Sequence, residues 1–125
     1  MIRVLIVDDQ LPFRLAAAAV VESTDSFVVA GAVESAEQAL AGIDAVRPDL
    51  VLMDVNMPGL GGVAASRRLR DEHPEVVVVL LSSYDEAEFA DLTDDCGAAA
   101  YLPKATFGPG KLAEIWSSTT GSPLS

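Results

Sequence analysis

The chain has 125 residues, a length that fits one domain. Half of the residues are hydrophobic and 22% are charged, a balance that excludes a disordered acidic tail and a membrane span. Eight basic residues against 19 acidic ones give a formal net charge of -11, which disfavours direct binding to nucleic acid. We therefore expect one folded globular domain that contacts neither nucleic acid nor membrane.

Cysteine content and the first residues indicate the compartment. Cys96 is the single cysteine, so an intrachain disulfide and a cysteine-rich zinc site are both excluded. Acidic residues begin at Asp8, before the apolar region of a signal peptide would be complete. We expect a cytoplasmic protein.

Five short apolar segments, rich in valine, isoleucine and leucine, recur along the chain. The expected strands span residues 2–7, 27–32, 50–53, 76–81 and 98–102. The first, third and fourth are apolar at consecutive positions, which is typical of strands covered by helices on both faces.

Helical signals follow each of these segments. Pro12 suits the first turn of a helix, and Ser35 with Gln38 has the spacing of a capping box. Pro48 ends the second helical segment, and Gly97 fits the end of the fourth. The expected helices span residues 11–22, 63–70, 86–95 and 110–117, and a further one lies between the cap at Ser35 and Pro48.

This alternation predicts an α/β fold with a parallel sheet and right-handed crossovers that place helices on both faces. We expect one domain over residues 1–118 and a short, flexible, polar tail over residues 119–125. Ligands of such sheets bind beyond the carboxyl ends of the strands, so the function is expected there.

Acidic residues follow two of the strands directly. Asp8 and Asp9 follow the first strand, and Asp54 follows the third. If these strands are neighbours, three carboxylates converge, and their repulsion calls for protons or a cation. Oxygen ligands in a small, open site favour Mg2+.

Two further polar residues follow the remaining strands. Ser82 adds a hydroxyl after the fourth strand, and Lys104 adds a positive charge after the fifth. A carboxylate nucleophile, a metal ion, a hydroxyl and an ammonium are the groups needed for phosphoryl transfer onto an aspartate. The expected product is an aspartyl phosphate.

Four motifs in order carry a resemblance that covers nearly the whole chain. They are the segments 4–9 (VLIVDD), 48–59 (PDLVLMDVNMPG), 81–85 (LSSYD) and 101–104 (YLPK). The sequence resembles the receiver domain of two-component response regulators. The segments 27–31 (FVVAG) and 81–85 resemble most closely the subfamily that usually carries a helix-turn-helix output domain. The resemblance implies a flavodoxin-like, doubly wound (βα)5 fold with strand order 2-1-3-4-5.

The resemblance also implies roles for the acidic residues. Asp54 would accept the phosphoryl group from a histidine kinase or a phosphotransfer protein. Asp9 would bind Mg2+ directly and Asp8 through water, while Asn56 would contribute its backbone carbonyl. These expectations describe a phosphoacceptor domain without further enzyme activity.

The resemblance assigns a switch to the other side of the pocket. Ser82 would hydrogen-bond the phosphoryl oxygens, Lys104 would pair with them, and Tyr101 would move inward when Ser82 shifts. The face made by the fourth helix, the fifth strand and the fifth helix would then change its binding to a downstream protein. Dimerisation on phosphorylation is a further expectation from the family.

Six acidic residues lie on the expected fourth helix and its entry: Asp85, Glu86, Glu88, Asp91, Asp94 and Asp95. If this helix belongs to the output face, we expect the downstream partner to be basic where it contacts the helix.

The sequence departs from the family pattern at two places. Gly61-Gly62 stands where an Asp-Gly pair is common, which we expect to change only the loop. Ala105 follows Lys104 where the family often has a proline joined by a cis bond. A cis bond to alanine costs about 3 kcal/mol, so a trans bond is expected.

Simpler interpretations stand beside these roles. Asp8 or Asp9 could cap the first helix, Ser82 could be a turn residue, and Tyr101 could be ordinary packing. Trp116 could cover the edge of the core or belong to an interface.

The leading expectation for the function is a stand-alone receiver that acts as a phosphorylation-dependent switch through protein contacts. This expectation has three alternatives. They are a truncated receiver of a DNA-binding regulator, an unphosphorylated scaffold and a Mg2+-dependent phosphatase. The phosphatase typically needs a second aspartate two residues after the nucleophile, where this chain has Asn56.

Overall fold

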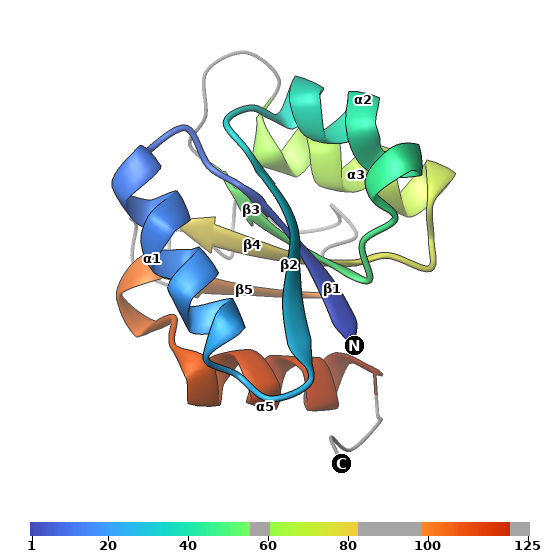
Figure 1. Ribbon diagram of the computed structural model, residues 1–125. Coiled ribbons are helices and arrows are strands. Elements are labelled where there is room, and N and C mark those ends of the chain that lie inside the picture. Colours follow the sequence, from blue (N-terminus) through green and yellow to red (C-terminus); the bar gives the residue numbers. More distant parts are fainter. Residues whose placement is uncertain (56–60, 83–98, 121–125) are drawn as a thin grey trace.

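The structure, a computed structural model, describes residues 1–55, 61–82 and 99–120 (Figure 1). Its strands are β1 (Ile2–Val7), β2 (Phe27–Val33), β3 (Leu50–Asp54), β4 (Val77–Ser82) and β5 (Ala100–Pro103). Its helices are α1 (Leu11–Glu22), α2 (Ala36–Val46), α3 (Gly62–Glu72), the short 3-10 helix η1 (Lys104–Thr106) and α5 (Pro109–Thr120).

The five strands form one parallel sheet in the order β2-β1-β3-β4-β5. The predicted parallel α/β fold and its strand order are thereby confirmed. In this order β1 lies beside β3, so the residues that follow these two strands meet at one edge of the sheet. That edge is the carboxyl end of the sheet, where ligands of this fold class bind.

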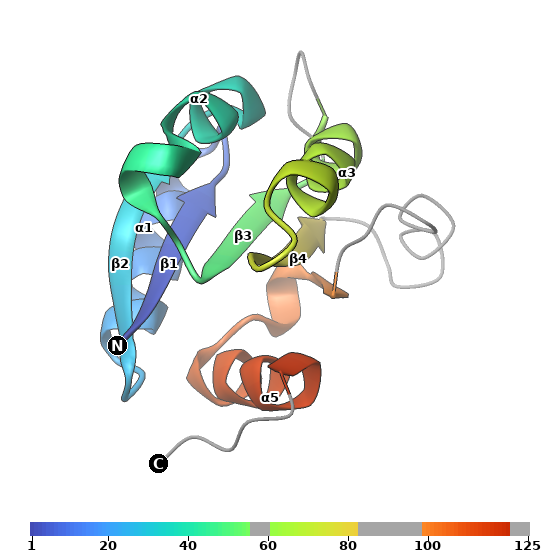
Figure 2. The same cartoon turned by 90° about the vertical axis from the view of Figure 1, so that its right-hand side faces the viewer.

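Two hydrophobic clusters cover the two faces of the sheet, which Figures 1 and 2 show between two pairs of helices. Helices α2 and α3 pack on one face through Ala39, Ile43 and Leu69. Helices α1 and α5 pack on the other face, where Val21 and Leu112 are fully buried. Because both faces are covered, the strands are apolar at consecutive positions, as the sequence indicated.

Strands β3 and β4 each extend one residue beyond the predicted end, so Asp54 and Ser82 belong to strands. The ladder continues because Asp54 pairs with Leu81 and the N–H of Val55 donates to the carbonyl oxygen of Leu81 at 3.0 Å. Both side chains are thereby placed by regular sheet structure instead of by a loop.

The helices agree with the sequence in part. Helix α1 has the predicted bounds, whereas α5 continues to Thr120, two residues into the segment expected to be a tail. The predicted fourth helix over residues 86–95 lies outside the described residues. Within the described part of the chain, no helix combines the length and the apolar character needed to cross a membrane.

The predicted cap of α2 is confirmed. The Ser35 hydroxyl oxygen accepts a hydrogen bond from the N–H of Gln38 at 3.1 Å. The Gln38 side chain accepts from the N–H of Glu34 at 3.0 Å, one residue before the position that a capping box uses. Two backbone donors at the start of α2 are thereby satisfied.

Candidate functional site

The sheet register brings Asp8 and Asp54 together. Val7, the last residue of β1, pairs with Met53 on β3, so Asp8 and Asp54 follow paired positions on adjacent strands. Both side chains are almost fully buried, at 1% and 3% exposure. Two carboxylates at neighbouring buried positions repel each other unless positive charge compensates them.

Asp9 completes an acidic cluster with these two residues. One carboxylate oxygen from each of Asp8, Asp9 and Asp54 lies within 4.8 Å of the others. Asp9 is exposed, so the cluster opens to solvent on its side. Three carboxylate oxygens with one open side form a donor set that suits a hard divalent cation that keeps some of its water.

Lys104 places a positive charge against the same cluster. It is the first residue of η1, directly after β5, and its side chain is 13% exposed. Its ammonium nitrogen lies 2.6 Å from Oδ2 of Asp8 and 3.4 Å from Oδ2 of Asp54. Three formal negative charges and one positive charge leave two negative charges, which one divalent cation would balance.

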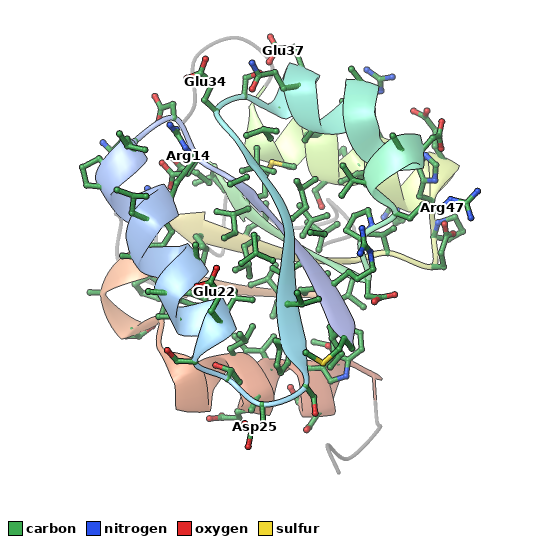
Figure 3. The ribbon with its side chains drawn as sticks, in the orientation of Figure 1. Arg14, Glu22, Asp25, Glu34, Glu37 and Arg47 are labelled. Atoms are coloured by element: carbon green, nitrogen blue, oxygen red, sulfur yellow. The ribbon has the colours of Figure 1, made fainter. Side chains whose placement is uncertain are left out.

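The loop after β1 holds the Asp8 carboxylate in place. The N–H of Gln10 donates to Oδ1 of Asp8 at 2.8 Å, a local turn typical of aspartate. The Arg14 side chain donates to the carbonyl oxygen of Asp8 at 2.7 Å, and Figure 3 shows Arg14 on α1 beside this loop. Gln10 is the N-cap residue of α1 and makes no side-chain cap. Asp8 therefore shapes the entry to α1 and also faces Lys104.

The other predicted site residues have different outcomes. Ser82 ends β4 and is fully buried, next in sequence to Leu81, the partner of Asp54. Tyr101 lies on β5, but its side chain lies outside the described part of the chain, as does the whole of Asn56. The predicted meeting of acids and lysine is thus found for Asp8, Asp9, Asp54 and Lys104.

Gly62 has a structural role that the sequence did not reveal. It is the first residue of α3, and a Cβ atom there would overlap the carbonyl oxygen of Asp54 and lie 3.0 Å from Cα of Val55. The absence of a side chain lets α3 start directly against the end of β3. The expectation that Gly61-Gly62 affects only the loop is therefore too narrow.

Phe13 is a second residue that the sequence did not single out. The ammonium nitrogen of Lys104 lies 4.6 Å from the centroid of the Phe13 ring, within the range of a cation–π contact. The signal available in the sequence was position: α1 begins three residues after Asp8, and side chains of a first helical turn tilt back toward the preceding loop.

The peptide bond that follows Lys104 is trans, as predicted. No peptide bond in the described ranges is cis, so the bond between Lys104 and Ala105 is trans.

The sequence matches one known protein family over most of its length. Residues 4–116 match the family model of the response regulator receiver domain. The response regulator GacA of Pseudomonas viridiflava is 39% identical over 104 residues, which cover 83% of this chain and 49% of that protein. DegU of Brevibacillus brevis, a transcriptional regulatory protein, is 34% identical over 103 residues, covering 82% of this chain and 44% of that protein. The chain thus spans about half the length of these curated relatives.

Solved structures give the same result for the fold. The signal receiver domain of NarL from Mycobacterium tuberculosis superposes with a TM-score of 0.86 at 27% identity, covering 97% of this chain and 98% of that one. The response regulator domain of CheB from Thermotoga maritima, at 23% identity, shares the fold with a TM-score of 0.83. The chain, with its acidic cluster at the carboxyl edge of a 2-1-3-4-5 sheet, belongs to the family of response regulator receiver domains, which act as phosphorylation-dependent signalling switches.

Proposed function

We propose that Asp54 is the phosphoacceptor of this receiver domain. The observation that carries the proposal is the placement of the buried Asp54 carboxylate at the carboxyl end of β3, in the acidic cluster and 3.4 Å from the Lys104 ammonium nitrogen. Of the three clustered acids, Asp54 is the one whose backbone belongs to a central strand. A fixed nucleophile supports attack along one direction.

The proposed step moves a phosphoryl group from a phosphohistidine of a sensor kinase or phosphotransfer protein to Asp54. A lone pair of an Asp54 carboxylate oxygen attacks phosphorus, and the new O–P bond forms as the N–P bond breaks. The electron pair of the broken bond stays on the imidazole nitrogen, which then takes up a proton. The product is an aspartyl phosphate, and no further reactant is needed.

Residues around Asp54 would stabilise the charge that develops on the phosphoryl oxygens. Lys104 lies close enough to Asp54 to turn toward those oxygens, and the buried Ser82 hydroxyl would donate to one of them. Asp8, Asp9 and Asp54 would hold Mg2+, together with the backbone carbonyl of Asn56. Bound Mg2+ would supply positive charge to the transferred oxygens.

We further propose how the signal leaves the pocket. Receiver domains interact with histidine kinases or phosphotransfer proteins, and a downstream protein would read the phosphorylated state of this one. Tyr101 would couple Ser82 to the output face of β5, α5 and the segment 86–95. The acidic residues of that segment favour a basic downstream partner. We also propose that two copies of the chain associate on phosphorylation, as the resemblance to the family implies. The cytoplasm is the proposed location, because the kinases that supply such phosphoryl groups act there.

Intact-protein mass spectrometry tests the phosphoacceptor directly. Incubation with acetyl phosphate and Mg2+ should add one phosphoryl group to the wild type and none to Asp54→Asn. Asp25→Asn, which removes an exposed carboxylate in the loop before β2, should be labelled like the wild type. An unlabelled wild type, or equal labelling of Asp54→Asn, would contradict the proposal. Continuous hydrolysis of a phosphomonoester would indicate the phosphatase instead.

A further inference from the structure

We propose that Phe13 is a positioning residue for phosphoryl transfer, whose ring holds the Lys104 ammonium at the pocket. This inference rests on the proposed function of Asp54. Its basis is the contact of 4.6 Å between the ammonium nitrogen and the centroid of the ring.

The ammonium contacts both the ring and the acidic cluster. It contacts Phe13 and also lies 2.6 Å from Asp8 and 3.4 Å from Asp54. The Lys104 side chain is 13% exposed, so little water competes with these contacts. A cation–π contact is stronger when the cation is shielded from water, because the low local dielectric strengthens the attraction.

The ring is itself fixed from two sides. Phe13 lies in the first turn of α1 and packs against the cluster between α1, α5 and the sheet. Its centroid lies 6.3 Å from that of Phe107, with the ring planes tilted by 49°. The N–H of Phe107 donates to the carbonyl oxygen of Lys104 at 3.2 Å, which closes η1. Phe13 and Phe107 thus link α1 to the same turn that carries Lys104.

A ring suits this task because it attracts the ammonium without accepting strong, directional hydrogen bonds. Asp8 engages Lys104 before phosphorylation, and the phosphoryl oxygens must engage it afterwards. An aromatic face leaves the N–H donors free to change partners while the nitrogen stays near the pocket. The turn has no proline at position 105 to restrict it, since Ala105 follows Lys104.

The test compares the rates at which acetyl phosphate and Mg2+ label four proteins: wild type, Phe13→Leu, Phe13→Tyr and Phe27→Leu. Phe13→Leu should be labelled about threefold more slowly or slower still, as expected for loss of a cation–π contact that is largely shielded from water. Phe13→Tyr keeps an aromatic face and should retain the wild-type rate. Phe27 lies in the same core cluster, with its ring against Trp116 at 6.3 Å, so Phe27→Leu controls for lost core packing and should also retain the rate.

A second comparison separates positioning from packing. In a Lys104→Met background the ring has no ammonium to hold, so Phe13→Leu should change the residual labelling rate no further. Should Phe13→Leu fail to fold, Phe13→Met offers a similar apolar volume without a ring.

The outcomes separate this inference from the proposed function. If the wild type is labelled and Phe13→Leu is labelled at the same rate, the role of Phe13 is overturned and Asp54 remains the acceptor. The same conclusion follows if Phe13→Tyr is labelled as slowly as Phe13→Leu. A wild type that takes no label would overturn the proposed function itself.

Discussion

The ammonium nitrogen of Lys104 lies 2.6 Å from Oδ2 of Asp8, an oxygen of the acidic cluster that we expect to bind Mg2+. That oxygen is buried and makes no hydrogen bond of good alignment within the described structure, so charge attraction is its main compensation. The lysine and a divalent cation therefore act on the same carboxylates. Without a cation, Lys104 balances part of their charge.

Lys104→Met should destabilise the protein in the absence of Mg2+. The change keeps the length of the side chain but leaves the carboxylates of Asp8 and Asp54 without their ammonium. Loss of one partner of a buried ion pair costs about 3 kcal/mol or more of unfolding free energy. Urea unfolding in EDTA measures this loss. Lys111→Met is the matched control, because Lys111 is 40% exposed and faces Glu114 at 3.8 Å. Equal stability of the two variants would contradict the role of Lys104.

Mg2+ should stabilise the wild type through the acidic cluster. At a concentration ten times its dissociation constant, a cation that binds only the folded state adds about 1.4 kcal/mol to the unfolding free energy. Asp9→Asn removes the exposed carboxylate of the cluster and should weaken Mg2+ binding, as measured by isothermal titration calorimetry. Asp25→Asn should leave the affinity unchanged. Equal Mg2+ affinity in both variants would place the cation elsewhere.

Gly62→Ala should destabilise the protein although alanine is the better helix former. The added Cβ would overlap the Asp54 carbonyl oxygen, a backbone atom of a central strand that cannot move without disturbing the sheet. Overpacking of this kind costs about 1–3 kcal/mol.

The neighbouring glycine provides the control for this substitution. Among the described residues, a Cβ at Gly61 would meet only the carbonyl oxygen of Val55, at 4.0 Å. Gly61→Ser also supplies a preferred N-cap residue for α3, so it should be neutral or stabilising. Thermal unfolding compares the two variants, and a Gly62→Ala protein as stable as the wild type would show that the contact relaxes without cost.

The α/β fold was predictable because short apolar strand segments alternate with helical segments along the chain. Consecutive apolar residues such as Leu50–Met53 mark strands buried on both faces, and the acids at their ends stand where strand order brings them together. The pairing of β1 with β3 came from the resemblance to a family and not from the apolar pattern. Strand pairing is decided by tertiary packing, which a single sequence does not display.

Residues whose roles depend on contacts between elements far apart in the sequence could not be predicted from the sequence pattern. Phe13 occupies an apolar position of α1 that core packing alone would explain from the sequence. Its contact with Lys104 depends on how α1 packs beside η1 and Phe107. The sequence pattern places Gly62 in a loop. The need for a residue without a Cβ atom at this position depends on how closely α3 approaches the end of β3. Helix α5 also continues past residue 118, since small polar residues such as Thr119 can stay in a helix when hydrogen-bonded to the preceding turn.

Ser35→Ala should cost about 1 kcal/mol of unfolding free energy. The substitution removes the hydroxyl that accepts from the Gln38 N–H and leaves a donor at the start of α2 without its partner. Ser118→Ala is the comparison, because that hydroxyl donates to the Ile115 carbonyl inside α5 and satisfies no helix-start donor. Urea unfolding followed by circular dichroism measures both. A loss for Ser118→Ala equal to that of Ser35→Ala would contradict a specific capping effect.

Chemical trapping of the acyl phosphate tests most directly whether Asp54 is the phosphoacceptor. Borohydride reduces an aspartyl phosphate to a homoserine residue, and peptide mass spectrometry then locates the reduced position. After incubation with acetyl phosphate and Mg2+, we expect reduction at position 54 and at none of the other acidic positions. Reduction at Asp9 or at another aspartate, with position 54 unchanged, would contradict the assignment of Asp54.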